Sequence, residues 1–219
     1  MKKIIVFSLM YLSLGLYGQD FMLTYSGLTA VQRGTHISDA GIVEGKISEI
    51  QTNDPKGRSM SLSIFDDSDM QLISNRIFKT IDCDKQKDCI DKHFDYNKSL
   101  FLKNSVIMFF QTFETSQKDL LLFAQKVNLQ GKFYGKFLQL DQIDAQKQRN
   151  AGSFMVWPSE DSTRFMIINS PPYEKYGGEK FNFKIYDESM NNLFNFGCSL
   201  PYKDKDFSLI DYYLTNDNK

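Results

Sequence analysis

The most reactive side chains in this sequence belong to three cysteines and two histidines. Cys83 and Cys89 flank a short charged loop, and an exported chain with this spacing favours a local disulfide. The alternative is a metal site that also uses His93, but the spacing matches no zinc pattern and a fourth ligand is missing. We therefore predict a disulfide and no metal. Cys198 lies in an apolar run and is interpreted as a small buried hydrophobic residue.

Sequence patterns for catalysis are absent or incomplete. Residues 57–61 resemble a nucleophile elbow, but the closing glycine is missing and the segment precedes an expected strand, whereas an elbow follows one. The sequence has neither a phosphate-binding P-loop nor an HExxH motif. His36 and His93 lie far apart along the chain. We expect no catalytic residue and no cofactor.

Carboxylates are abundant, so an acid pair of the glycosidase type is the chemistry to weigh. Residues 66–69 (Asp-Asp-Ser-Asp) and 187–188 (Asp-Glu) occupy the same place in two copies of a sequence repeat. This favours a structural role, because Asp and Ser side chains bond to turn backbone. Calcium binding by Asp66, Asp67 and Asp69 is the alternative; the second copy has Met190 where Asp69 stands, which argues against it.

The repeat is the strongest signal for the fold. Residues 61–72 recur as residues 182–193, and a weaker copy lies midway at residues 121–133. Each copy reads as an alternating strand, a turn and a second apolar strand. A repeat of roughly 60 residues indicates that one small unit is stacked several times.

Flanking segments complete the unit. Residues 164–169 form an apolar run typical of a strand buried on both faces, and residues 153–157 precede it as a further strand. Residues 20–58 look β-rich but do not align with the repeat. The sequence therefore predicts an all-β fold of about three antiparallel four-stranded blades of an incomplete β-propeller. The expected divisions are a signal peptide (1–18), a partial first blade (19–79), a second blade with the Cys83/Cys89 loop (80–142), and a third blade with the start of a fourth (143–219).

The N-terminus predicts export. Lys2 and Lys3 precede an apolar stretch, Ile4–Tyr17, and Gly18 supplies a small residue before a cleavage point. That stretch is shorter than the roughly 20 residues that span a bilayer; the alternatives are an uncleaved anchor or a buried helix. No later segment is long and apolar enough to cross a membrane. The expected location is the periplasm, the outer cell surface or the medium.

The net charge argues against nucleic acid as a partner. Lys and Arg number 26 and Asp and Glu 27, which gives a net charge of −1. A chain so balanced has no electrostatic footprint for nucleic acid.

Three segments carry a family resemblance: residues 149–154 (Arg-Asn-Ala-Gly-Ser-Phe), 158–162 (Pro-Ser-Glu-Asp-Ser) and 201–207 (Pro-Tyr-Lys-Asp-Lys-Asp-Phe). Together with the hairpin 183–193 they resemble exported bacterial β-propeller-like repeat proteins of uncharacterised function. The resemblance covers most of 95–219 and stops before the family's next glycine and strand. It implies the propeller fold and a chain that is the N-terminal part of a longer protein, and it carries over no catalytic residue.

Tyrosines on stiff loops are the best candidates for recognition. Tyr173 and Tyr176 lie in a loop bounded by Pro and Gly, and Tyr202 lies in the following connection. Such side chains stack on sugars or anchor a protein partner; the alternative is that they pack between blades. The expected function is an exported non-enzymatic scaffold or binding module for an unknown protein or glycan of the cell envelope. The alternatives are an extracellular carbohydrate-active hydrolase with its carboxylates on the loop face, and a remnant without activity.

Overall fold

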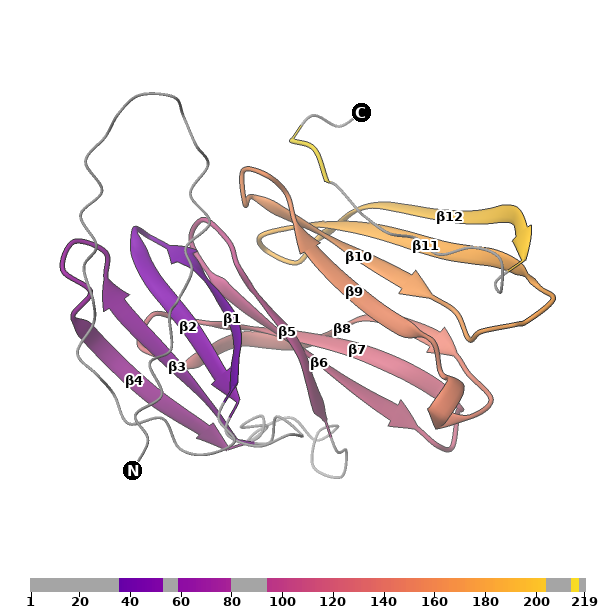
Figure 1. Cartoon of the computed structure of the whole chain (residues 1–219), viewed down its shortest axis with the longest axis horizontal. Helices are drawn as coiled ribbons and strands as arrows, with labels where there is room; N and C mark the ends of the chain where they lie inside the picture. Colours follow the sequence, from indigo (N-terminus) through magenta and orange to yellow (C-terminus); the bar gives the residue numbers. More distant parts are fainter. Residues whose placement is uncertain (1–35, 53–58, 80–93, 204–213, 217–219) are drawn as a thin grey trace, which may run out of the picture.

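The computed structural model of the chain describes residues 36–52, 59–79, 94–203 and 214–216. These residues form three antiparallel four-stranded sheets, each with its strands in sequence order (Figure 1). The first sheet has β1 (His36–Val43), β2 (Lys46–Thr52), β3 (Ser59–Asp66) and β4 (Leu72–Lys79). The middle sheet has β5 (Asp95–Phe101), β6 (Val106–Glu114), β7 (Asp119–Val127) and β8 (Phe133–Asp144). The third has β9 (Ser153–Pro158), β10 (Arg164–Ser170), β11 (Gly178–Asp187) and β12 (Asn192–Lys203).

The all-β prediction is confirmed, and the repeat has a structural basis. The three copies are the hairpins β3–β4, β7–β8 and β11–β12, the last two strands of each sheet. β1 and β2 come from the region that did not align with the repeat. One short 3-10 turn, Gln148–Asn150, is the helical structure found in the described ranges, and none there is long or apolar enough to cross a membrane.

The two clearest copies differ by one residue in their turns. Met70 and Met190 both adopt a left-handed backbone, with φ of 57° and 65°. The turn that contains Met70 is closed by a hydrogen bond from Asp66 N to Gln71 O, and the turn that contains Met190 by one from Asp187 N to Asn191 O. The first turn is therefore one residue longer, and Met190 corresponds to Met70 in structure. An ungapped alignment, which sets Met190 against Asp69, is wrong at this point.

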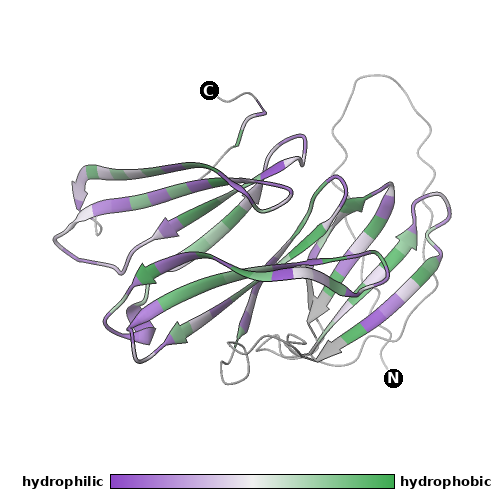
Figure 2. Ribbon diagram, turned by 180° about the vertical axis from the view of Figure 1, so that it is seen from behind, coloured by the Kyte–Doolittle hydropathy of each residue, from purple (hydrophilic) through white to green (hydrophobic). Residues whose placement is uncertain are grey.

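The middle sheet packs against a neighbour on each face. Along β6, Val106, Met108 and Phe110 contact the first sheet, and Ile107 and Phe109 contact the third. All five side chains are at most 1% exposed. Burying a side chain of this size contributes about 1.5–3 kcal/mol, so these two interfaces are the main source of stability. Apolar and polar residues alternate along most of the other strands (Figure 2).

The first strands of the three sheets lie next to one another. β5 contacts β1 on one side and β9 on the other. The first hairpin turns are also linked through backbone: Glu44 N donates to Lys103 O at 3.3 Å, and Lys103 N donates to Ser162 O at 3.0 Å. The same position in each sheet is thus joined to its counterpart in the next, as expected of a repeated unit stacked in one direction.

Polar groups at the interfaces are tied across sheets. Asp39 of the first sheet accepts hydrogen bonds from Ser99 N at 2.8 Å and from the Tyr96 hydroxyl of the middle sheet. Lys184 of the third sheet lies 2.7 Å from Asp141 of the middle sheet. Because a buried polar group is costly without a partner, these pairs favour one relative placement of the sheets.

Candidate functional site

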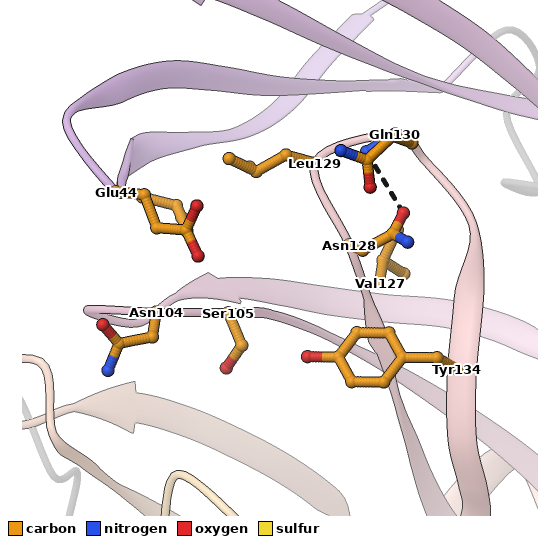
Figure 3. A pocket seen from close by; sticks show the side chains of 9 residues that line it. Glu44, Asn104, Ser105, Val127, Asn128, Leu129, Gln130 and Tyr134 are labelled. Carbon is orange, nitrogen blue, oxygen red and sulfur yellow. Dashed lines mark hydrogen bonds between the residues drawn. The ribbon is translucent and has the colours of Figure 1, made fainter.

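A pocket of about 240 Å³ opens between the first and middle sheets, at the end where their first hairpin turns meet. The first sheet contributes Val43. It also contributes Glu44, which is labelled in Figure 3. The middle sheet contributes the β5–β6 turn, the β7–β8 turn and the start of β8, with these lining residues: Asn104, Ser105, Val127, Asn128, Leu129, Gln130 and Tyr134. The lining is therefore mostly polar, with one carboxylate and one aromatic ring.

Local sequence sets the β7–β8 turn that forms one wall. The Asn128 side-chain oxygen accepts hydrogen bonds from Gln130 N at 3.1 Å and Lys132 N at 2.9 Å. Gly131 has φ of 66°, a conformation that disfavours other residues. A Cβ at Gly131 would also lie 2.8 Å from the Cβ of Arg76 in the first sheet. The turn is thus preorganised and held close to the neighbouring sheet.

The opposite wall is braced by the third sheet. Glu188, in the β11–β12 turn, accepts hydrogen bonds from Asn104 N at 2.8 Å, from Asn104 Nδ2 at 3.0 Å and from Ser105 Oγ at 3.1 Å. Three hydrogen bonds to one carboxylate hold the β5–β6 turn in a single arrangement. All three sheets therefore take part in shaping the pocket.

Two carboxylates, Glu44 in the lining and Glu188 behind it, act on the Tyr134 hydroxyl. Burial raises the pKa of Tyr134, and the charges of Glu188 and Glu44 raise it further. Tyr134 thus stays neutral at physiological pH, with a hydroxyl that can both donate and accept. Glu44 is held at φ of 50° in the tight β1–β2 turn, with its side chain exposed at the pocket mouth.

Among the described residues, the lining does not bring together a nucleophile and an activating imidazole. None of the nine described lining residues is a histidine or a cysteine. Ser105 donates its hydroxyl to Glu188, and no imidazole in the lining activates it. The arrangement can bind and orient a polar molecule, with the Tyr134 ring available for stacking.

The predicted tyrosines lie at the other end of the third sheet. Tyr173 and Tyr176, in the β10–β11 loop, are 54% and 72% exposed, and Tyr202 near the end of β12 is 56% exposed. The loop is anchored by Asn150, whose side chain exchanges hydrogen bonds with the backbone N and O of Tyr173 at 3.1 and 3.3 Å. These side chains are exposed, and their role in binding stays a prediction.

Three turn aspartates bond to their own turns, whereas Glu188 bonds to the middle sheet. Asp66 accepts from Ser68 N and Oγ, Asp161 from Thr163 N and Oγ1, and Asp187 from Asn191 N. Hydrogen bonds from Ser68 lower the pKa of Asp66, and those from Ser159 and Thr163 lower the pKa of Asp161. This is the structural role that the repeat predicts for Asp66 and Asp187, but Glu188 departs from it because its carboxylate bonds to the neighbouring sheet.

The structure tests only some of the cysteine and metal predictions. Cys83, Cys89 and His93 lie outside the described residues. Cys198 is a free thiol on β12 and is only partly buried, because β12 is the edge strand of its sheet. Within the described ranges, no three His, Cys, Asp or Glu residues are grouped to hold a metal ion.

The pocket itself was not predicted from the sequence. Each of its turns can be predicted from local sequence, since residues 44–45 (Glu-Gly) and 128–131 (Asn-Leu-Gln-Gly) are typical turn sequences. The repeat could have shown that such turns gather at one end of stacked sheets. It could not have shown which of them leave a space.

Comparison with protein families, curated proteins and solved structures finds no match to this chain.

Proposed function

We propose that this chain is an exported, non-enzymatic scaffold of the β-propeller type that binds a neutral carbohydrate in the pocket between its first and middle sheets. The propeller proposal is supported by three consecutive four-stranded sheets in simple strand order. It is also supported by the contacts of β5 with β1 and β9, which a propeller would place around a common axis. Export rests on the N-terminal sequence alone.

The composition of the pocket is the single observation that carries the binding proposal. A carboxylate accepts hydrogen bonds from sugar hydroxyls, side-chain amides both donate and accept, and an aromatic ring stacks on the apolar face of a sugar. Glu44, Gln130 and Tyr134 supply these three kinds of group. The nearby charges of Glu44 and Glu188 disfavour uronic or sialic acids, so a neutral or amino sugar fits best.

A glycan array followed by titration calorimetry tests this function. Neutral glycans of the cell envelope are expected to bind and acidic glycans to be rejected. A hydrogen bond to a charged group contributes about 1.5–3 kcal/mol, so Glu44→Ala should weaken binding by roughly tenfold or more. Tyr134→Ala should weaken it as well, through the lost ring and hydroxyl.

Two matched controls decide where the ligand sits. Glu160→Ala removes an exposed carboxylate of the third sheet and should leave affinity unchanged. Tyr176→Ala removes the most exposed of the loop tyrosines and should also have no effect. Loss of binding only in Tyr176→Ala would move the site to the β10–β11 loop. Absence of binding to every glycan, or turnover of any of them, would contradict the proposal.

A further inference from the structure

The first strand of the middle sheet joins the preceding sheet through two contacts. Phe101, the last residue of β5, packs against the cluster between the first and middle sheets. Two residues later, Lys103 O accepts the hydrogen bond from Glu44 N in the first hairpin turn of the preceding sheet. The third sheet repeats this arrangement, since Val156 of β9 is buried in the cluster shared with the middle sheet and Ser162 O accepts from Lys103 N. An apolar contact followed by a hydrogen bond between turns thus marks where one sheet joins the sheet before it.

Residues 214–216 make the same two contacts with the third sheet. Leu214 packs on the face that points away from the middle sheet, here called the outer face, against a buried cluster of three residues: Met166, Ile168 and Phe181. Two residues later, the Asn216 side-chain oxygen accepts a hydrogen bond from Asp161 N in the β9–β10 turn at 2.9 Å (Figure 1). Asn216 Nδ2 also donates to Glu160 of that turn at 3.4 Å. The spacing and the direction of the hydrogen bond are those found in the middle sheet, although the acceptor here is a side-chain oxygen.

The rest of the outer face is apolar and becomes more exposed toward β12. The cluster under Leu214 is 0–7% exposed. Phe183 and Ile185 of β11 are half-buried beside it. Their β12 partners Phe196 and Phe194 are 52% and 51% exposed, with ring centroids 6.4 Å apart. On the middle sheet, by contrast, the apolar side chains of β7 that face the third sheet are 0–8% exposed, and they are Leu120, Leu122 and Ala124.

We propose that the outer face is the interface for a fourth antiparallel sheet of the same repeat, and that residues 214–216 form the end of its first strand. A unit of this kind buries its apolar face only by stacking on a neighbour. The remaining strands of the fourth sheet cover the apolar side chains of β11 and β12. The pocket lies between the other two sheets, so this proposal and glycan binding can fail separately.

The contacts of Leu214 and Asn216 favour this occupant over others. A partner that packed directly on the buried cluster would have to displace Leu214 and break the two hydrogen bonds of Asn216 with the β9–β10 turn. A sheet whose first strand ends with these residues keeps all of these contacts. It also continues an interface that the chain already forms twice, with the same sheet-on-sheet packing.

An extended chain tests the interface. In it, Asn216 is followed by a copy of residues 104–144, which supplies β6, β7 and β8 in the register that Lys103 sets in the middle sheet. Cys198 is paired with Phe181 on the outer face, so the added sheet should slow alkylation of the Cys198 peptide by iodoacetamide about tenfold or more. The matched control carries the same added residues in shuffled order and should be alkylated as fast as the chain without an extension.

Substitutions locate the contact and cover the case in which one variant does not fold. In the extended chain, Phe196→Glu and Phe194→Glu should each restore fast alkylation, because a charge would be buried in the new interface. Ile77→Glu, at a 65% exposed position of the first sheet, should leave alkylation slow. In the chain without an extension, Leu214→Asp should speed alkylation, because Leu214 packs on the cluster that contains Phe181.

Three results would overturn the proposal. The first is an equal alkylation rate in the ordered and shuffled extensions. The second is an unchanged rate in Leu214→Asp, which would show that this residue does not hold the outer face. The third is slowing that appears only at high protein concentration, which would mean that two copies associate instead. Glycan affinity should stay the same in all of these variants.

Discussion

Replacing Lys184 with methionine tests whether the middle and third sheets depend on one buried ion pair. Lys184 Nζ lies 2.7 Å from Asp141 Oδ1, and the two side chains are 22% and 2% exposed. The same oxygen accepts a hydrogen bond from Gln142 N, while Asp141 Oδ2 has no hydrogen-bond partner among the described residues. Lys184 is therefore the one cation that compensates the buried carboxylate in this part of the structure.

The size of the expected stability loss depends on the burial of Asp141, which remains charged when Lys184 is replaced. Methionine keeps most of the aliphatic stem of lysine, so the loss is chiefly electrostatic. Removing one member of a buried pair costs about 3–5 kcal/mol, because the remaining charge stays in a poorly solvated site. Since Lys184 is partly reached by water, we expect the low end, about 3 kcal/mol.

Urea denaturation of Lys184→Met, Asp141→Asn and the double variant measures this coupling. The asparagine can still accept the hydrogen bond from Gln142 N, and it removes the charge. The double variant should therefore be more stable than Lys184→Met alone, by roughly 2 kcal/mol. A loss below about 0.5 kcal/mol in Lys184→Met, or additive losses in the double variant, would refute the account of the pair as an interface constraint.

Three further predictions concern stability and pH. Phe165→Ala, at a fully buried position between the middle and third sheets, should lower the free energy of unfolding by about 3–5 kcal/mol in urea melts; a loss under 1 kcal/mol would contradict the packing. Gly131→Ala should destabilise the chain and weaken glycan binding together, because the new Cβ meets Arg76 and the left-handed backbone is strained; unchanged calorimetry would argue against a preorganised turn. Burial and the charge of Asp39 raise the pKa of Tyr96 above its usual value of 10, so the folded state retains a proton that the unfolded state loses. Stability should therefore be fully present below pH 10 and fall as the pH rises above it, and Tyr96→Phe should flatten that fall in pH-dependent melts.

The sequence predicted the fold class because the repeat recorded strand order directly. Alternation in the hairpin copies marks which residues face each neighbour, and the apolar run 164–169 marked a strand buried on both sides. The same method failed for β1 and β2, where Glu49 and Ser48 interrupt the apolar pattern that the other sheets show. It also misaligned the turn at Met70, because an alignment without gaps cannot represent the one extra residue of the first turn.

The candidate pocket could not be predicted from the sequence, for a different reason. Its lining residues come from three turns. The β5–β6 and β7–β8 turns lie about 60 and 85 positions after the β1–β2 turn in the sequence. Each turn alone has an ordinary composition. A space arises between them because the β7–β8 turn is pinned by Asn128 while the β5–β6 turn is drawn toward Glu188 of the third sheet. Such a space depends on the relative position of three sheets, which no local pattern encodes.

Polar pairs explain how those positions are determined. Apolar contact between sheet faces is non-directional, so it stabilises stacking without selecting one offset between sheets. The hydrogen bonds of Asp39 with Tyr96, and of Glu188 with Asn104, are satisfied at one offset only. The first of these is part-buried and therefore costly to leave unmade. They therefore convert a general attraction between sheets into a defined arrangement of turns. The binding pocket is a consequence of that arrangement, so substitutions at Glu188 should alter ligand affinity although its carboxylate is not among the groups that line the pocket.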